Sequence, residues 1–558
     1  MVTRTEGEES TSLLHSNNQA TDYQTVNNNN DLDQVVTSEI ILDPELERKK
    51  EIQKRLNGAS LFTVLLGLWV GVGLASLDGS IVATVYPAIG SEFHKSNDII
   101  WVATSYMLSY SALQPLYGRL SDSFGRKTTL QFSVVVFFIG SLLCGAATGL
   151  WTLVFARTVA GIGGGGLNTI SSVITSDLVT LRERGTYQGY ANIWYAVGAL
   201  VGAPLGGFLT DTIGWRYCFY INIPFLIISL YVSTFILTDY NLEEKDIQQS
   251  AWERAKGIDY IGAILIVIAI LAIMIATSLG GNSRPWSDPF VVGCLVTFFV
   301  LIVAFLFVEK YWAKNPLMPW YVVTGRTSLA CSFSNFLGVL CSFATTFILP
   351  LYLQALLGYS PSEAGLLFLP KVIGGSLGSL YAGFHMKRTG EYRYFLIFSA
   401  TLQLASMVCY SVWDAHVSNY VMLPCLFADG FSAGAIITSA LIAMLSVVEL
   451  SDMATMTSVS YLFRSTGAVI GISLSQAIFQ GIVKSELSKK ITGPNAEEII
   501  EIARKSMMEI RNLLPSEVLE PVLETYQHAI QYAFIFCAVV ALLNVIATLF
   551  IKQHSLKK

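Results

Sequence analysis

The sequence predicts an all-α polytopic membrane protein that crosses the bilayer fourteen times. The 558-residue chain is 53% hydrophobic and only 13% charged, which is about half the charged fraction of an ordinary soluble domain. Apolar runs of about 20 residues, the length a membrane-crossing helix needs, recur along the chain. The eight cysteines and six histidines show no spacing typical of a disulfide framework or a metal site. We therefore expect a protein embedded in membrane lipid, with no metal, no cofactor and no nucleic-acid partner.

The N-terminal residues 1–56 are polar and rich in Asn, Ser, Thr and Glu, so we expect them to form a disordered cytosolic tail. Within this tail, Glu9, Leu13 and Leu14 fit an acidic dileucine pattern. That pattern resembles the sorting signals that vesicle adaptors bind on vacuolar and lysosomal membrane proteins. The cationic run 48–50, just before the first apolar run, places this end of the chain in the cytosol.

The apolar runs form two groups of six with two further runs between them. Residues 57–238 hold the first six-helix half, 239–327 a linker with two extra spans, and 328–558 the second half. The expected spans are 60–88, 99–118, 129–147, 152–175, 186–209, 217–237, 259–279, 289–308, 328–350, 362–383, 392–411, 419–445, 458–480 and 529–551. Lys and Arg then collect in the loops of one side, which puts both termini in the cytosol and makes 484–527 a lumenal loop.

A short polar stretch between the second and third spans combines glycines with opposite charges. Gly118 and Gly125 permit close backbone approach and a tight turn. Asp122 can interact with a neighbouring helix N-terminus, and Asp177, just past the fourth span, is well placed to meet Arg126. We interpret this stretch as a latch that breaks and re-forms during a conformational change.

Charged side chains also occur within the apolar runs. They are Asp78, Arg157, Lys371 and Asp429. Each costs about 2.5–3.5 kcal/mol at a helix centre on insertion scales, so packing alone does not favour them. Asn168 falls on the same helical face as Arg157. These five residues are candidates for a functional polar site, the alternative being a set of structural ion pairs. Arg464, near the cytosolic end of the thirteenth span, is interpreted as a snorkelling or latch residue.

Several of these motifs resemble those of one transporter family. The spacing G-x-L-x-D-x-x-G-R-K resembles the signature between helices 2 and 3 of the major facilitator superfamily. The fifth span is similar to the antiporter motif of proton-coupled exporters, with Ala203 where that motif usually has Gly. The matching residues are Gly198, Gly202, Pro204, Gly206 and Gly207. The segments around Asp78 and Trp215 resemble the fourteen-span drug:proton antiporter branch.

Within that branch, residues 177–192 together with 114–117 look closest to fungal vacuolar basic amino-acid transporters. This resemblance implies a major facilitator fold and a proton-coupled antiporter that moves Lys, Arg or His from the cytosol into the vacuole. A plasma-membrane multidrug:proton exporter and a non-transporting nutrient sensor are the alternatives. An enzyme is not expected, since no nucleophile–base arrangement or phosphate-binding loop is visible in the sequence.

The substrate that the resemblance implies sets the roles expected of the charged residues. A basic amino acid carries cationic groups and one carboxylate, so its site needs acidic and basic partners. We expect Asp78 and Asp429 to meet the cations and Lys371 or Arg157 to meet the carboxylate. Asp78 is expected to bind the proton, because one carboxylate that takes proton and cation in turn is the simplest route to exchange.

Overall fold

The computed structural model describes most of the chain between residues 60 and 556. The described ranges are 60–93, 100–237, 253–254, 259–281, 284–313, 316–359, 361–414, 417–449, 452–491, 497, 499–500, 503, 510 and 515–556. The predicted tail, with Glu9, Leu13 and Leu14, lies outside them.

Long helices lie at each predicted span. The first half holds α3 (Leu61–Phe93), α4 (Ile100–Phe124), α5 (Arg126–Gly145), α6 (Leu150–Leu178), α7 (Leu181–Thr212), α8 (Tyr217–Tyr220) and α9 (Asn222–Phe235). The linker holds α12 (Tyr260–Leu279), α13 (Pro289–Tyr311) and the short α14 (Trp320–Thr324). The second half holds α15 (Arg326–Pro350) with its π-helical extension η1 (Leu351–Leu356), α16 (Pro361–Thr389), α17 (Arg393–Ser411), α18 (Asn419–Leu445), α19 (Met453–Lys490) and α22 (Ser516–Leu549).

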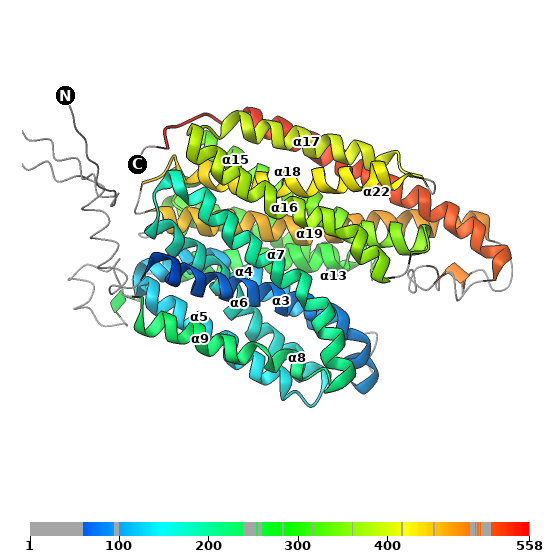
Figure 1. Cartoon of the computed structure of the whole chain (residues 1–558), viewed down its shortest axis with the longest axis horizontal. Helices are drawn as coiled ribbons and strands as arrows, with labels where there is room; N and C mark the ends of the chain where they lie inside the picture. Colours follow the sequence, from blue (N-terminus) through cyan, green and yellow to red (C-terminus); the bar gives the residue numbers. More distant parts are fainter. Residues whose placement is uncertain are drawn as a thin grey trace, which may run out of the picture. The chain divides into compact units, whose positions relative to one another are not determined.

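The packing of the first half is repeated in the second. In the first half α3 packs on α7, α4 and α5 pack on α6, and α5 packs on α9. The corresponding pairs in the second half are α15 with α19, α16 and α17 with α18, and α17 with α22. The halves meet where α7 packs on α16 and α4 packs on α19, and Figure 1 shows α7 and α16 lying between the two groups. The fold is therefore two six-helix halves with α12 and α13 inserted between them in sequence.

Thirteen helices of the described residues are long and apolar enough to cross a membrane. The remaining predicted span, 99–118, is occupied by α4, which has 25 residues and packs on α6 and α19. Polar side chains within α4, among them Ser105, Ser109 and Gln114, keep the mean hydropathy of its most apolar stretch below that of the thirteen helices. The number of fourteen spans therefore stays a prediction.

Two expected loops prove to be more helical than predicted. The helices α4 and α5 are separated by Gly125 alone, which has a φ of 96° and so adopts the left-handed conformation that favours glycine. Gly118 consequently lies inside α4 rather than in a turn. The predicted lumenal loop 484–527 is shorter than expected, because α19 continues to Lys490 and α22 begins at Ser516. At both ends of this loop, the apolar residues recur at helical spacing, so the flanking helices extend into it.

The glycine run of α6 allows this helix to contact two neighbours closely. A Cβ on Gly163 would lie 2.6 Å from the Cα of Phe137 in α5, and one on Gly165 would lie 2.5 Å from the carbonyl oxygen of Tyr110 in α4. Real Cβ atoms do not approach other atoms so closely, so these positions have no room for a side chain. The glycine run thus lets α4 and α5 pack closely on α6, the helix that carries the buried Arg157 and Asn168.

Gly163→Ala should lower the stability of the folded bundle. Inserting a methyl group at a close helix contact costs about 1–3 kcal/mol through overpacking. Gly293→Ala in α13 is the matched control, because a Cβ there has nothing within 4 Å. The measurement is the apparent melting temperature of the detergent-purified protein. We expect a clear decrease for Gly163→Ala and none for Gly293→Ala; equal melting temperatures would contradict the packing described here.

Candidate functional site

The first half buries an ion pair between α3 and α6. The Nη1 of Arg157 lies 2.5 Å from Oδ2 of Asp78, and both side chains are about 1% exposed. The other carboxylate oxygen of Asp78 accepts a hydrogen bond of 3.0 Å from Nδ2 of Asn222 in α9. The guanidinium of Arg157 also lies over the ring of Tyr106, 4.1 Å from its centroid. Both oxygens of Asp78 are therefore engaged, and the pair ties three helices of this half together.

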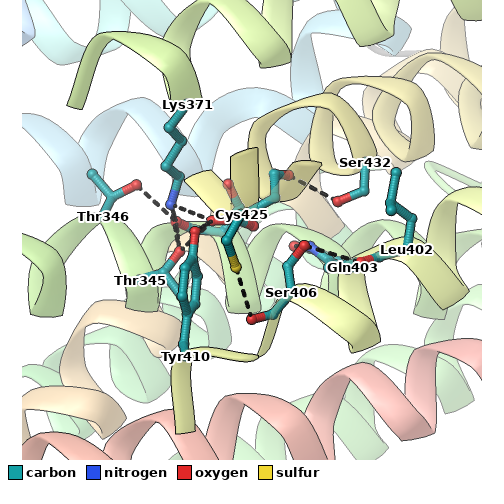
Figure 2. Close-up of polar contacts among 12 residues, drawn as sticks. Thr345, Thr346, Lys371, Leu402, Gln403, Ser406, Tyr410, Cys425 and Ser432 are labelled. Atoms are coloured by element: carbon teal, nitrogen blue, oxygen red, sulfur yellow. Dashed lines mark hydrogen bonds and ion pairs between the residues drawn. The ribbon is translucent and has the colours of Figure 1, made fainter. Parts of the chain in front are cut away.

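The second half buries a corresponding pair between α16 and α18. The Nζ of Lys371 lies 3.0 Å from Oδ2 of Asp429, and it also donates to the carbonyl oxygen of Ser342 at 3.0 Å and to Oγ1 of Thr345. The hydroxyl of Tyr410 donates to the same Oδ2 at 3.2 Å. Figure 2 shows the Lys371 amine and the Tyr410 hydroxyl pointing toward the same place, beside Thr345.

Asp429 differs from Asp78 in one respect. Its Oδ1 atom is buried and has no hydrogen-bond partner among the described residues, while Asp429 as a whole is 0% exposed. A buried carboxylate oxygen without a partner carries a large desolvation penalty when the group is charged. The sequence could not reveal this difference, because it depends on which donors the fold places beside each carboxylate.

A cavity of about 410 Å³ lies between the two halves. This volume falls in the range of roughly 300–1,000 Å³ that is usual for small-molecule sites. Residues of α3, α4, α6 and α7 line one side and residues of α15, α16, α18 and α19 the other. Apolar and aromatic side chains predominate, and no Asp or Glu is among the described residues that line it.

Of the five predicted site residues, two line the cavity and three do not. Asn168 and Lys371 line the cavity, whereas Asp78, Arg157 and Asp429 do not. The Nδ2 of Asn168 donates to the hydroxyl of Tyr110 at 2.5 Å, which holds both polar groups at the wall. Asp78, Arg157 and Asp429 instead have partners inside their own halves, so their expected contact with the substrate stays a prediction.

One cation lies elsewhere than the sequence predicts. Arg464 lines the cavity instead of lying at the membrane face, since α19 begins at Met453 and continues to Lys490. Arg464 therefore lies eleven residues inside the helix, roughly 16 Å from its start at 1.5 Å per residue. The signal that could have located it is the run of small and polar residues that follows it in α19.

The predicted latch residues meet within the first half. The Nη1 of Arg126 lies 2.6 Å from Oδ1 of Asp122, and its Nε lies 2.8 Å from Oδ2 of Asp177. The pairing of Arg126 with Asp177 is thereby confirmed. The cluster joins α4, α5 and α6 and does not itself bridge the halves. The contact across the halves is made by Gly118, where a Cβ would lie 2.9 Å from the carbonyl oxygen of Ala454 in α19.

Other polar contacts do join the halves at the same end of the bundle, which we call the latch end. The Nζ of Lys387 in α16 lies 2.8 Å from Oε1 of Glu183 in α7, and Arg182 donates to the carbonyl oxygen of Lys387 at 2.5 Å. Next to the cavity, Nδ2 of Asn192 donates to Oγ of Ser379 at 2.6 Å. These contacts close the interface between α7 and α16 on the latch side of the cavity.

The antiporter-like motif lies where α7 crosses α3. A Cβ on Gly202 would lie 2.9 Å from the carbonyl oxygen of Leu77, and a Cβ on Gly198 would meet the backbone of Gly73. Pro204 lies inside α7. The carbonyl oxygen of Gly206 accepts a hydrogen bond of 2.7 Å from Thr210, while a Cβ on Gly207 would have nothing within 4 Å. The motif therefore holds α7 against the segment of α3 that carries Asp78.

Comparison with known proteins adds a family and three close relatives. The family model described as Major Facilitator Superfamily matches residues 68–472. Multidrug resistance protein fnx1 of Schizosaccharomyces pombe is 38% identical over 92% of this chain and 96% of its own length. Vacuolar membrane amino acid uptake transporter fnx2 of the same yeast is 36% identical over 89% and 85%. Vacuolar basic amino acid transporter 1 of Saccharomyces cerevisiae is 29% identical over 94% and 98%.

Asp78→Asn should destabilise the protein because it leaves Arg157 buried without a counter-charge. Removing one member of a buried pair costs about 3–5 kcal/mol, whereas replacing both members by neutral groups is often tolerated. We expect the apparent melting temperature to fall for Asp78→Asn and to recover when Arg157→Met is added. A single variant that melts like the parent, or a double variant that melts no higher than the single one, would contradict a structural role for the pair.

Proposed function

The chain belongs to the Major Facilitator Superfamily, and we propose that it is a proton-coupled antiporter that moves basic amino acids from the cytosol into the vacuole. The observation that carries this proposal is the buried Lys371–Asp429 pair at the cavity, with a separation of 3.0 Å. Lys371 lines the cavity while Asp429 lies behind it. A change of charge on Asp429 therefore reaches a molecule in the cavity through Lys371.

The pair provides a physical route to exchange. When Asp429 is ionised, it balances the charge of Lys371, and the cavity tolerates a cationic substrate. When Asp429 takes a proton, the charge of Lys371 is no longer balanced and repels such a substrate. Like charges interact strongly at low dielectric, so the proton and the cationic amino acid compete although they bind at different atoms. An acidic vacuolar lumen then favours release of the substrate there.

The surroundings of Asp429 support proton binding at its free oxygen. Its neighbours are the amine of Lys371 from α16, the hydroxyl of Thr345 from α15 and the hydroxyl of Tyr410 from α17, all directed at Oδ2. Oδ1 remains without a hydrogen-bond partner among the described residues. The sequence alone placed the proton on Asp78, but both oxygens of Asp78 have partners. The geometry favours Asp429 as the proton site and Asp78 as a structural anion.

The arrangement of the halves suggests which state of the transport cycle this is. The Glu183–Lys387 pair and the Arg182 hydrogen bond hold the halves together at the latch end. Cavity residues further along the helices are partly exposed, with Met107 at 42% and Tyr195 at 39%. With the latch end in the cytosol, as the distribution of cations predicts, this state is closed toward the cytosol and receives protons from the lumen. The names of two relatives, both of which describe vacuolar amino-acid transporters, support this direction and location.

A multidrug exporter is the second candidate. It is favoured by the cavity wall, which is largely apolar and aromatic and carries no Asp or Glu among its described residues. Such a wall suits amphipathic molecules of many shapes. The relative named as a multidrug resistance protein also supports this alternative.

Uptake by the full-length protein in proteoliposomes distinguishes these candidates. Radiolabelled lysine, arginine and histidine should accumulate when the interior is acidic, and a proton ionophore should abolish the accumulation. Fluorescent lipophilic cations serve as the multidrug probes under the same conditions. Accumulation of the lipophilic cations without any uptake of amino acids would favour the exporter, and a protein that moves neither would be consistent with a sensor.

Asp429→Asn should abolish lysine accumulation driven by the pH gradient, because the amide has no charge to lose or gain. The initial rate of driven uptake should fall by at least about tenfold, which corresponds to roughly 1.4 kcal/mol. Asp78→Asn is the comparison, and both variants are measured in the fraction that folds, because each leaves a buried cation without its counter-charge. Driven uptake that survives in Asp429→Asn and is lost in Asp78→Asn would return the proton to Asp78.

A further inference from the structure

The guanidinium of Arg464 lies at the cavity without a counter-charge. No acidic side chain pairs with it among the described residues, and its Nη1 is buried with no hydrogen-bond partner. Its Cζ lies 4.6 Å from the centroid of the Tyr461 ring, so the aromatic face meets only part of its charge. A cation in this position is costly unless something else compensates it.

Two other buried cations, Arg157 and Lys371, are compensated from within. Arg157 is paired with Asp78. All three donors of the Lys371 amine are engaged, by Ser342, Thr345 and Asp429. Lys371 is therefore not free to bind a ligand in this state, whereas Arg464 is.

Further donors without partners line the same cavity. The indole Nε1 of Trp69, on α3, is buried and has no acceptor in the described structure, although the side chain is only 2% exposed. An indole N–H can only donate. The hydroxyl of Ser171, on α6, is likewise buried and unpartnered, and both residues line the cavity. Donors without acceptors, in a cavity that is also lined by an uncompensated cation, call for a ligand that brings negative charge and acceptor oxygens.

We propose that Arg464 binds the carboxylate of the transported amino acid. A guanidinium matches a carboxylate through two parallel hydrogen bonds, and a neutral donor such as Trp69 adds affinity but no charge. This assignment rests on the proposed function, since it names the group of the substrate that the cavity holds. It replaces Lys371 and Arg157, which the sequence suggested for this role, with a residue contributed by α19.

The proposal also accounts for the absence of acidic residues from the described cavity wall. With its carboxylate on Arg464, a basic amino acid presents its ammonium groups to a wall that contains Tyr110, Tyr195 and the amide of Asn168. Aromatic faces and amide oxygens stabilise cations without carrying charge of their own. The acidic group that controls the cation is then Asp429, which acts through Lys371 from behind the wall.

The test compares two ligands that differ only at the carboxylate. L-lysine and L-lysinamide compete with radiolabelled lysine for the purified full-length protein in detergent, at a pH where lysinamide keeps the same ammonium groups. For the wild type, lysine should bind about 10- to 100-fold more tightly than lysinamide, which is the usual effect of one charged hydrogen-bonded pair. Arg464→Gln should weaken lysine binding by that factor, leave lysinamide binding unchanged and so remove the discrimination. Arg464→Lys should restore part of it.

Arg326→Gln is the matched control, since Arg326 is exposed, lies outside the cavity and donates to the carbonyl oxygen of Phe550. It should bind both ligands like the wild type. Wild-type protein that binds lysinamide as tightly as lysine would overturn the carboxylate anchor while leaving amino-acid transport in place. Equal weakening of both ligands by Arg464→Gln would overturn it as well, because that result indicates a structural role. A wild type that binds no lysine would overturn the proposed function, and the anchor with it.

Discussion

Charge compensation inside the bundle is the constraint on which the rest of this structure depends. Asp78 with Arg157, Lys371 with Asp429 and Arg126 with two aspartates each join helices of one half. A buried pair of this kind contributes little net stability, but breaking it costs several kcal/mol. Each half is therefore held together as a unit that resists internal rearrangement.

The contacts between the halves are of a different kind. The ion pair between Glu183 and Lys387 is 39% and 48% exposed on its two sides, and exposed pairs contribute only about 0–1 kcal/mol. Close helix crossings without side chains, such as that of Gly185 with Gly383, allow the halves to fit tightly. Two rigid halves joined by weak contacts at one end are suited to rocking about a central site, which is how many secondary transporters expose a midplane site to each side in turn.

Arg464 has no counter-charge among the described residues, and this is why we propose that a ligand completes the cavity. Under the proposed function, a substrate carboxylate supplies the missing charge at Arg464, and a proton on Asp429 changes the net charge of the Lys371–Asp429 pair. In this proposal the substrate and the proton act through different residues, Arg464 on α19 and Lys371 on α16. Both residues belong to the second half, so the first half contributes shape, aromatic surface and the polar pair of Asn168 with Tyr110.

The sequence was sufficient to locate the helices and the charges, because apolar runs and the cost of burying charge are local properties. The position of Asp177, just past the fourth span, also predicted its pairing with Arg126. It could not establish that Asp78 faces Arg157 and Asn222, or that Asp429 keeps a free oxygen, because both depend on helix contacts between distant segments. Gly118 and Arg464 were misplaced for a simpler reason. Polar residues at a helix end were taken as the end of the helix, whereas α4 and α19 continue through them.

Competition between the proton and the substrate is the central claim, and proton release on binding tests it most directly. Lysine is added to the purified protein in weakly buffered detergent solution, and the pH change is recorded over a range of starting pH values. We expect lysine binding to release up to one proton per protein where Asp429 is protonated, and none in Asp429→Asn. Proton uptake on binding, or release that is unchanged in Asp429→Asn, would contradict it.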